Sequence, residues 1–261
     1  MRRIRATRSF PGQTLFVLLR AGLSGVLILI WTSFCAVFGI VTLIVSPSGK
    51  AYLSLAKYWA KVALGIAGVK LVKKALFWPK TDERYLYISN HESVFDIIVL
   101  YALLPQRVVM VAKHTLFYIP IFGWGMWLAG FVFVKRHKPK QAYKSLKKAV
   151  THLKNSRSVL IFAEGTCDNG KSLLPFKRGA FLLAQICQIP IIPIGISGVH
   201  KVLTPDHYLI FPGRVFAYFG RPILPPVSEK DIEACKQKTR QAVLSLKKKA
   251  QQLLTSQNSL N

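Results

Sequence analysis

The chain has 261 residues, of which 51% are hydrophobic, and its 37 Lys and Arg against 10 Asp and Glu give a formal net charge of +27. Its 16 Phe, 5 Trp and 9 Tyr supply enough apolar surface to offset the entropy cost of folding, which excludes a disordered polycation. The four cysteines form no close pair, which argues against a disulfide-stapled secreted domain and favours a reducing compartment. The charge predicts an anionic partner: phospholipid, nucleic acid, an acidic protein or a phosphorylated substrate.

The first predicted element is a membrane segment. No residue between Arg20 and Lys50 is charged, and residues 21–45 are long enough to cross about 30 Å of hydrocarbon as a helix. Several arginines and no acidic residue precede it, so the positive-inside tendency places the N-terminus in the cytoplasm. A cleaved signal peptide is the alternative, but the segment exceeds a typical h-region and no clear cleavage site closes it. A single crossing would put the rest of the chain outside, whereas a hairpin or an embedded helix would return it to the cytoplasm.

The second predicted element is a basic amphipathic helix. Apolar residues recur at helical spacing, and lysines fall on the opposite side. The apolar positions are Leu55, Trp59, Val62, Ile66 and Val69, and the lysines are Lys50, Lys57 and Lys61. Such a helix lies in the headgroup layer of a membrane, although a helix buried against a domain has the same periodicity. Residues 1–72 are therefore predicted to form a membrane-associating module, followed by a second domain over residues 73–261.

From residue 73 onward, predicted strands and helices alternate. Strands are expected at residues 85–89, 107–112, 131–135, 158–162 and 191–196, and helices at 93–104, 116–128, 139–154 and 178–187. This order is typical of an α/β domain with a mostly parallel sheet flanked by helices. Beyond it we expect an edge hairpin (208–211 and 215–219), a last helix opened by a capping box at Ser228 and Asp231, and a disordered tail (255–261).

A cluster of polar residues follows the strand expected at 85–89, and it includes His91 and Asp96. In open α/β sheets, ligands gather at the carboxyl ends of strands. Five positions span about 500° of a continuous helix, so His91 must lie in the strand-to-helix loop if Asp96, in the first helical turn, is to contact it. The carboxylate would then fix the imidazole tautomer and leave the other nitrogen as a general base. A histidine that only caps the loop is the alternative.

A second cluster, Glu164, Gly165 and Thr166, follows the strand expected at 158–162. Gly165 permits a tight turn, and the backbone N–H groups together with Thr166 can bind an anion. Glu164 is predicted either to hold an acceptor hydroxyl or to position the loop. An ordinary glycine-rich turn is the alternative.

The two clusters together resemble the glycerolipid acyltransferase family typified by 1-acyl-sn-glycerol-3-phosphate acyltransferases. That family carries Asn-His-x-Ser-x-x-Asp and, later in the chain, Phe-Pro-Glu-Gly-Thr-Arg. The first motif matches Asn90, His91, Ser93 and Asp96, and the second matches Phe162, Glu164, Gly165 and Thr166. Other blocks resemble the family at Lys113, Gly130, Phe133, Arg136, Pro190, Pro193, Gly220 and Pro222. The resemblance extends over residues 85–223 in the family's order.

The resemblance implies an O-acyltransferase of phospholipid biosynthesis in which residues 73–261 form the acyltransferase domain. It would move a fatty acyl group from an acyl thioester to the free hydroxyl of lysophosphatidate, giving phosphatidate. His91, oriented by Asp96, would remove the hydroxyl proton without an acyl-enzyme, and Lys113 or backbone N–H groups would stabilise the oxyanion. An acyl-carrier protein or coenzyme A thioester is the expected donor, with no other cofactor and no metal. The expected partner is a membrane phospholipid surface, with the catalytic domain on the cytoplasmic face.

The chain departs from the family at two positions. Cys167 replaces the arginine after Gly-Thr, and Ala163 replaces the proline. The arginine commonly binds phosphate in the family, so glycerol 3-phosphate, another lysophospholipid or a lyso-aminolipid remain alternative acceptors. The cations that would supply the charge instead are Lys113, Arg136, Lys177 and Arg178. Cys167 as a nucleophile is a further alternative.

Other function classes are less favoured. A nucleic-acid-binding protein would concentrate its basic residues and carry a recognition motif, whereas these lysines and arginines are spread over the whole length. The lysines at 144, 147, 148 and 154 are read as a solvated helix face or as a docking face for lipid or carrier. A serine hydrolase lacks support because there is no G-x-S-x-G elbow. A non-catalytic membrane scaffold with the same fold stays open.

Overall fold

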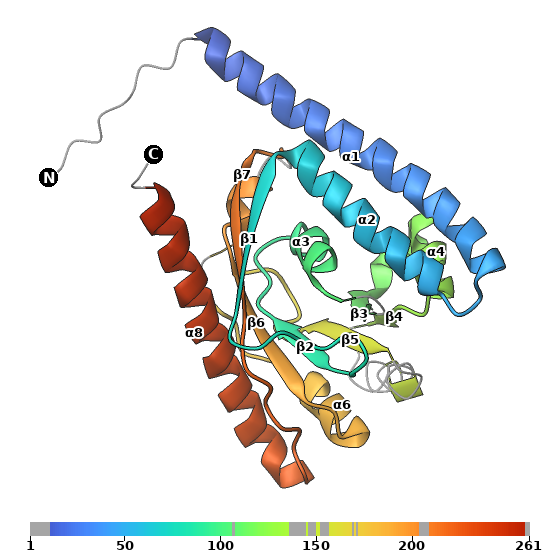
Figure 1. Ribbon diagram of the computed structural model, residues 1–261, viewed down its shortest axis with the longest axis vertical. Coiled ribbons are helices and arrows are strands. Elements are labelled where there is room, and N and C mark those ends of the chain that lie inside the picture. The colour runs from blue at the N-terminus through green and yellow to red at the C-terminus, as the bar shows by residue number, and fades with distance from the viewer. Residues whose placement is uncertain are drawn as a thin grey trace, which may run out of the picture.

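The computed structural model describes residues 11–105, 108–135, 145, 150–151, 157–168, 170, 172–203 and 209–258. Its N-terminal part is a hairpin of two helices, α1 (Pro11–Val45) and α2 (Lys50–Ala67), joined at Gly49 (Figure 1). Two indole hydrogen bonds hold the helices together: Trp31 Nε1 donates to the Trp59 carbonyl at 3.1 Å, and Trp59 Nε1 donates to Thr32 Oγ1 at 2.9 Å. The chain therefore returns along the helix that was predicted as the membrane segment.

Helix α1 starts at Pro11, well before the predicted start at residue 21. It remains long and apolar enough to cross a membrane over residues 15–45. A stripe at Ala21, Ser24 and Ile28 is buried, and small side chains in that stripe let α2 approach closely. Large apolar side chains on the remaining surface of α1, such as Phe16 and Ile44, are exposed.

Helix α2 is buried on one face against the rest of the protein, as the alternative interpretation of its periodicity expects. Leu53, Ala60 and Ala63 are buried, and α2 packs against α3 (Asp96–Leu103). Lys57 points inward and donates to the Leu104 carbonyl at 2.9 Å. The helix ends at Gly68, so Val69, predicted within it, lies in a strand instead.

The core is a seven-stranded sheet, within the part of the chain that the structure describes, in the order β1-β7-β6-β2-β5-β3-β4. Its strands are β1 (Val69–Ala75), β2 (Leu86–Ser89), β3 (Val108–Lys113), β4 (Val132–Val134), β5 (Ser158–Phe162), β6 (Ile191–Ser197) and β7 (Gly213–Phe219). All neighbours are parallel except β6 and β7. The predicted mostly parallel α/β fold is confirmed. Strand β1 was not predicted, and it crosses the expected boundary between residues 72 and 73.

The predicted edge hairpin of residues 208–211 and 215–219 is wrong. Strand β7 lies inside the sheet between β6 and β1, while Ile210 makes only a single bridge with Leu203. The physical reason is burial of both faces of β7. Phe216 packs in one small core with Ala250 and Leu254 of α8 (Ile232–Asn258), and Phe219 packs in the main core.

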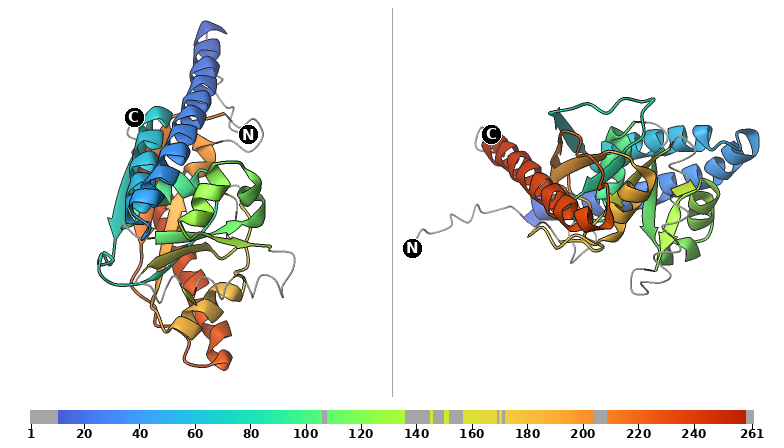
Figure 2. Two further views of the ribbon diagram at one scale, coloured as in Figure 1. Left: turned by 90° about the vertical axis from the view of Figure 1, so that its right-hand side faces the viewer. Right: turned by 90° about the horizontal axis from the view of Figure 1, so that it is seen from below.

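Helices cover both faces of the sheet. Figures 1 and 2 show α8 along one face and α1, α2 and α3 on the other. The predicted helix at 116–128 is split into a 3-10 turn η1 (His114–Tyr118) and α4 (Phe122–Leu128), because Pro120 interrupts the helical hydrogen bonds and Ile121 adopts a positive φ of 65°. The remaining short elements are α6 (Gly179–Cys187), α7 (Val199–Val202) and η2 (Glu229–Asp231).

Two further predictions concern the ends of helices. The capping box at Ser228 and Asp231 is confirmed at the start of η2 and α8. The predicted disordered tail is wrong for residues 255–258, which continue α8. Most of the helix predicted at residues 139–154, with the lysines at 144, 147, 148 and 154, lies outside the described residues, as does Arg136.

Candidate active site

The two polar clusters predicted from the sequence meet at one edge of the sheet. Strands β2, β5 and β3 are neighbours and run parallel, so their carboxyl ends coincide. The loop after β2 carries His91, the loop after β5 carries Glu164, and β3 ends at Lys113. This convergence builds a site from residues that are far apart in the chain.

His91 and Asp96 form the predicted contact. His91 lies in the loop after β2, Asp96 is the first residue of α3, and His91 Nδ1 lies 2.8 Å from Asp96 Oδ2. The Ser93 N–H donates to the same carboxylate oxygen at 3.0 Å. The Phe162 ring stacks on the imidazole with a centroid distance of 4.0 Å. Because Asp96 occupies Nδ1, the imidazole is fixed with Nε2 as its second, reactive position.

The pKa values of the pair are both displaced. Burial lowers the pKa of His91, but hydrogen bonds to Asp96 and to Cys167 outweigh it and raise the pKa from 6.5 to about 9. Complete burial raises the pKa of the Asp96 carboxyl from 3.8 to about 6, although the hydrogen bond from His91 opposes the shift. Above about pH 6 the resting pair is therefore an imidazolium beside a carboxylate, and neutral imidazole accumulates as the pH rises toward about 9.

Glu164 holds backbone on both sides of the site. Its Oε1 accepts from the His91 N–H at 2.8 Å, and its Oε2 accepts from the Leu174 N–H at 2.7 Å. The residue is 2% exposed, and burial raises the pKa of its carboxyl to about 7. This arrangement matches the loop-positioning alternative for Glu164, since both oxygens are engaged by the main chain. Gly165, next in the chain, adopts the positive φ of 81° that its turn requires.

A cleft of about 550 Å³ opens beside His91. Of the predicted residues, it is lined by Lys113, Gly165 and Thr166 as well as by His91, and Cys167 also lies on it. Sequence reasoning missed His114 and Lys135, which line the same cleft. Both directly follow the carboxyl ends of strands, so the rule that located His91 could have found them.

Lys177 and Arg178, two other cations predicted at the site, are not placed on the cleft as Lys113 is. A Cβ added to Gly165 would lie 3.7 Å from two carbons of the Lys177 side chain, so Lys177 runs over the glycine turn at the rim of the site. Arg178 pairs with Glu229 at 2.7 Å, which ties it to η2 instead of the cleft. Asn90, from the first motif, also has a structural contact: its amide bonds both the N–H and the carbonyl of Ile196 in β6.

Cys167 lies against His91, which no local sequence pattern indicated. The interaction with Cys167 contributes to the raised pKa of His91. The side chain is half-buried on the cleft. The position of the family arginine is thus occupied by a small group that contacts the histidine. Among the described residues, no group of three or more His, Cys, Asp and Glu side chains could hold a metal ion.

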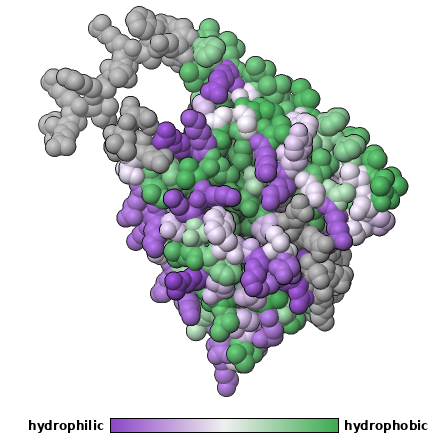
Figure 3. Space-filling view, viewed as in Figure 1, coloured by the Kyte–Doolittle hydropathy of each residue, from purple (hydrophilic) through white to green (hydrophobic). Residues whose placement is uncertain are grey.

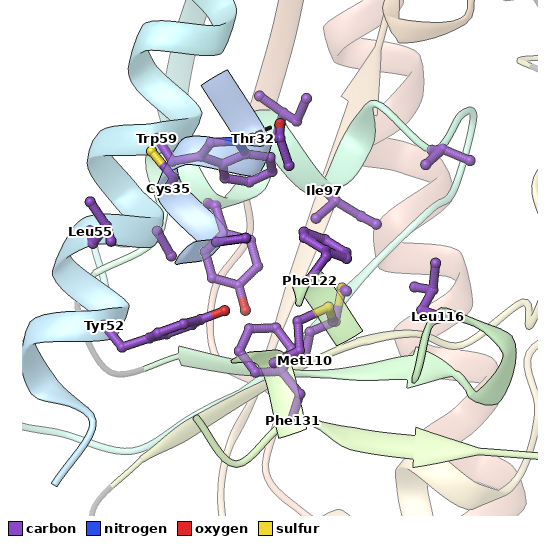
Figure 4. Close-up of a pocket in the computed structure, with 16 residues that line it drawn as sticks. Thr32, Cys35, Tyr52, Leu55, Trp59, Ile97, Met110, Leu116, Phe122 and Phe131 are labelled. Atoms are coloured by element: carbon purple, nitrogen blue, oxygen red, sulfur yellow. Dashed lines mark hydrogen bonds between the residues drawn. The ribbon is translucent and has the colours of Figure 1, made fainter. Parts of the chain in front are cut away.

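An apolar cavity of about 200 Å³ adjoins the cleft (Figure 4). The residues that line it come from helices α1, α2, α3 and α4, from strand β3 and from the adjoining loops, and most of them are apolar. Those labelled in Figure 4 are Thr32, Cys35, Tyr52, Leu55, Trp59, Ile97, Met110, Leu116, Phe122 and Phe131. Cavity and cleft share Val94, Ile97, Met110 and Leu116. The polar site around His91 therefore continues into an apolar space beneath the N-terminal helices.

Comparisons with known proteins agree with this geometry. A family model described as Acyltransferase matches residues 71–197. A 1-acyl-sn-glycerol-3-phosphate acyltransferase of Saccharomyces cerevisiae is 32% identical over 77% of this chain and 68% of its own length. The alpha form of the same enzyme from Mus musculus is 31% identical over 83% of this chain and 77% of its own length.

A solved structure supports the fold. The crystal structure of a 1-acyl-sn-glycerophosphate acyltransferase from Thermotoga maritima superimposes with a TM-score of 0.74. It covers 90% of this chain and 98% of the other, at 23% sequence identity.

Proposed function

Because the chain belongs to the family of 1-acyl-sn-glycerol-3-phosphate acyltransferases, we propose that it transfers a fatty acyl group from a thioester to the free hydroxyl of lysophosphatidate, giving phosphatidate. The observation that carries this proposal is the His91–Asp96 pair on a cleft that continues into an apolar cavity. A polar proton acceptor beside a space for hydrocarbon suits a reaction in which a lipid hydroxyl meets an acyl chain.

In the proposed mechanism His91 acts as the general base. Its Nε2 takes the proton of the acceptor hydroxyl while the hydroxyl oxygen forms a bond to the acyl carbonyl carbon. The carbon–sulfur bond of the thioester then breaks, and the proton passes from His91 to the departing thiolate. Asp96 stabilises the imidazolium that forms in between. A base with a raised pKa binds the hydroxyl proton more strongly, at the cost of a smaller neutral fraction at pH 7.

Substrate contacts follow from the lining of the two spaces. The apolar cavity receives the acyl chain, since burying each methylene contributes about 0.8 kcal/mol. Lys113 and Lys135 on the cleft, with Lys177 at its rim, supply positive charge for the acceptor phosphate in place of the family arginine. Lys113 at the end of β3, or a backbone N–H, stabilises the oxyanion. The donor is an acyl-carrier protein or coenzyme A thioester.

The membrane surface completes the proposal, because both the acceptor and the product are lipids. The exposed face of α1 is apolar, and Figure 3 shows apolar residues along this side of the molecule. We place α1 in the membrane and the catalytic domain on the cytoplasmic face, since the residues before α1 are arginine-rich and the α1–α2 hairpin returns the chain.

The test is acyl transfer by detergent-purified protein. Labelled acyl-carrier protein and acyl-coenzyme A are offered as donors, with lysophosphatidate, glycerol 3-phosphate, larger lysophospholipids and a lyso-aminolipid as acceptors. His91→Ala runs in parallel, with circular dichroism as the folding control. We expect phosphatidate from the wild type and none from His91→Ala. Equal transfer by His91→Ala would refute the mechanism, and transfer only to another acceptor would refute the substrate assignment.

A further inference from the structure

A buried lysine from the C-terminal helix reaches the active-site loops. Lys247 belongs to a run of three lysines in α8 that looks solvated in the sequence. In the structure Lys247 is 5% exposed, whereas its neighbours Lys248 and Lys249 are exposed. A buried lysine has a large desolvation cost unless it is paired, so its surroundings carry information about its role.

Close packing of α8 on strand β6 brings Lys247 to this position. Gly195 of β6 lies directly under it: a Cβ added there would stand 2.2 Å from the Lys247 backbone nitrogen. Any larger residue at 195 would push the helix away. Gly195 therefore lets α8 lie close to the sheet at Lys247. From there the Lys247 ammonium reaches the loops after β2 and β5.

The Lys247 ammonium lies between two carboxylates. Its Nζ is 2.6 Å from Asp168 Oδ2 and 3.8 Å from Glu92 Oε1. The other Glu92 oxygen is already engaged by the N–H groups of Gly198 and Val199 and by His200 Nδ1. Glu92 Oε1 makes no hydrogen bond within the described part of the chain, so its charge is offset by Lys247.

Both carboxylates belong to residues that hold His91. Glu92 follows it in the chain, and the Asp168 N–H donates to the His91 carbonyl at 2.7 Å. The Glu164 carboxylate accepts from the His91 N–H on the other side of the residue. The N–H and the carbonyl of His91 are thus both hydrogen-bonded. Asp168, which binds the carbonyl, is connected to α8 through its ion pair with Lys247.

The same helix holds the far end of the Glu164 loop. Arg240 of α8 donates to the carbonyls of Leu173 at 2.7 Å and Leu174 at 3.2 Å. The Leu174 N–H in turn donates to Glu164. Two basic residues of α8 therefore bind the segment between Glu164 and Leu174, Lys247 at Asp168 and Arg240 at its Leu174 end.

We propose that Lys247 is a positioning residue for acyl transfer, because its ion pair with Asp168 fixes the backbone of His91. Helix α8 thereby contributes to the geometry of the active site. The proposal rests on the proposed function, because it assigns the geometry of the same histidine. The charged groups that face Lys247 are Asp168 and Glu92 from the two loops, with His200 of α7 and Glu164 one contact further away.

The first test compares Lys247→Met with Lys248→Met, which alters an exposed lysine of the same helix. We expect Lys247→Met to lower kcat by about 10²-fold, the loss typical of a displaced catalytic group, while KM for the donor stays unchanged. Losing the cation that offsets Asp168 and Glu92 leaves uncompensated negative charge on the loops that hold His91, which favours the imidazolium, so the pH profile of kcat moves to higher pH. Lys247→Arg retains the charge and is expected to keep the wild-type profile. Unchanged kcat in Lys247→Met would overturn the proposal.

The second test separates positioning from folding. Lys247→Met leaves the buried Asp168 carboxylate unpaired and lowers Tm, whereas Lys247→Met with Asp168→Asn also removes that carboxylate and is expected to restore most of the lost Tm, with only the more distant Glu92 left unpaired. If the ion pair positions His91, kcat stays low in the double variant. Recovery of kcat together with Tm would show that Lys247 serves stability alone and would overturn the proposal.

An NMR titration of the His91 imidazole distinguishes this proposal from the proposed function. It measures the side chain directly in the full-length protein and needs no substrate. We expect an altered titration in Lys247→Met and an unchanged one in Lys248→Met. A wild type with no acyl transfer would refute the proposed function, while an unchanged His91 titration in Lys247→Met would refute the positioning role.

Discussion

Asp96 determines both which nitrogen of His91 is available and how strongly that nitrogen binds a proton. Asp96→Asn replaces an acceptor-only group with an amide that can also donate, so the tautomer is no longer fixed. We expect kcat to fall by about 10²- to 10⁴-fold, the usual contribution of general base catalysis, with little change in KM for either substrate. Initial rates measure this, with circular dichroism as the folding control. An unaltered kcat in a folded Asp96→Asn protein would remove His91 from the role of base.

The raised pKa of His91 predicts the pH dependence of activity. Neutral imidazole is the base, so kcat/KM is expected to rise with pH between about 7 and 9 and to level off above the pKa of about 9. In Asp96→Asn the rise moves to lower pH, because the hydrogen bond to Asp96 is the largest contribution that raises the pKa. Rates corrected for thioester hydrolysis give the two profiles. A wild-type profile centred near the ordinary value of 6.5 would contradict the prediction.

The same shift has a consequence for stability with a definite sign. A histidine whose folded pKa lies above its unfolded value stabilises the fold fully below the unfolded pKa of 6.5 and loses that contribution as the pH rises through about 9. Activity and this contribution to stability therefore change in opposite directions over the same interval. Rates between pH 6.5 and about pH 9 should therefore be measured over times at which the protein remains folded.

Cys167 is close enough to His91 to raise the question of an acyl-enzyme. Direct attack by the acceptor hydroxyl requires no thiolate, so Cys167→Ala is expected to keep kcat within the same order of magnitude. Protein quenched with labelled donor and no acceptor should carry no label at this residue. A label that Cys167→Ala abolishes together with transfer would instead establish a covalent intermediate.

At the scale of elements, continuous apolar runs were predictable and interrupted ones were not. Strands β2, β5 and β6 are buried on both faces, so their sequences are mostly apolar, with a serine only at one end of each, and their predicted bounds differ by at most one residue from those observed. Strand β1 was missed because Lys70, Lys73 and Lys74 break its pattern, which its parallel pairing with β7 tolerates. Pairing partners far along the chain leave no trace in local periodicity.

The site shows the same difference between features that local sequence could indicate and features that arise from packing between distant segments. His91 and Asp96 are five positions apart on one loop and helix, so helix geometry could state the condition for their contact, with His91 in the loop before the helix. Lys247 and Asp168 are 79 positions apart, and only the packing of α8 on β6 brings them together. The apolar cavity also arises from packing, because α1, α2, α3 and α4 each contribute part of its wall.

The lining of that cavity predicts that α2 influences which acyl-chain length the protein prefers. Ala56 of α2 lines it, and Ala56→Phe would fill part of the space. Each methylene that can no longer be buried loses about 0.8 kcal/mol, or about fourfold in kcat/KM, so the preferred donor chain should become shorter. A series of donors of increasing chain length measures the preference. Ala51→Phe, on the same helix outside the cavity, is the control, and an equal shift in both variants would argue against the cavity as the acyl-chain site.

At the scale of the whole molecule, apolar surface collects where α1 meets α4. Helix α4 packs against α1 and exposes Trp124 and Trp127, while neighbouring Tyr118 and Ile119 are also exposed. No Asp, Glu, Lys or Arg occurs between Lys113 and Lys135. Lys113 and Leu116, which line the catalytic cleft, begin this segment. A bilayer in contact with α1 would therefore also meet α4 beside the cleft that we propose receives the lipid substrates.

This arrangement predicts that Trp124 and Trp127 of α4 contact the membrane surface and thereby help the protein to use membrane-bound substrate. Indole rings favour the membrane interface, so changing both Trp124 and Trp127 to Ser is expected to raise KM for lysophosphatidate in anionic vesicles by at least about tenfold. Turnover of a short-chain, water-soluble acceptor should stay near the wild-type value, because the cleft itself is intact. Trp78→Ser is the matched control, since Trp78 is 53% exposed against 49% and 55% for the α4 pair but lies beyond β1, away from α4. If the double variant loses activity equally on vesicles and on soluble acceptor, its tryptophans support the cleft and not membrane contact.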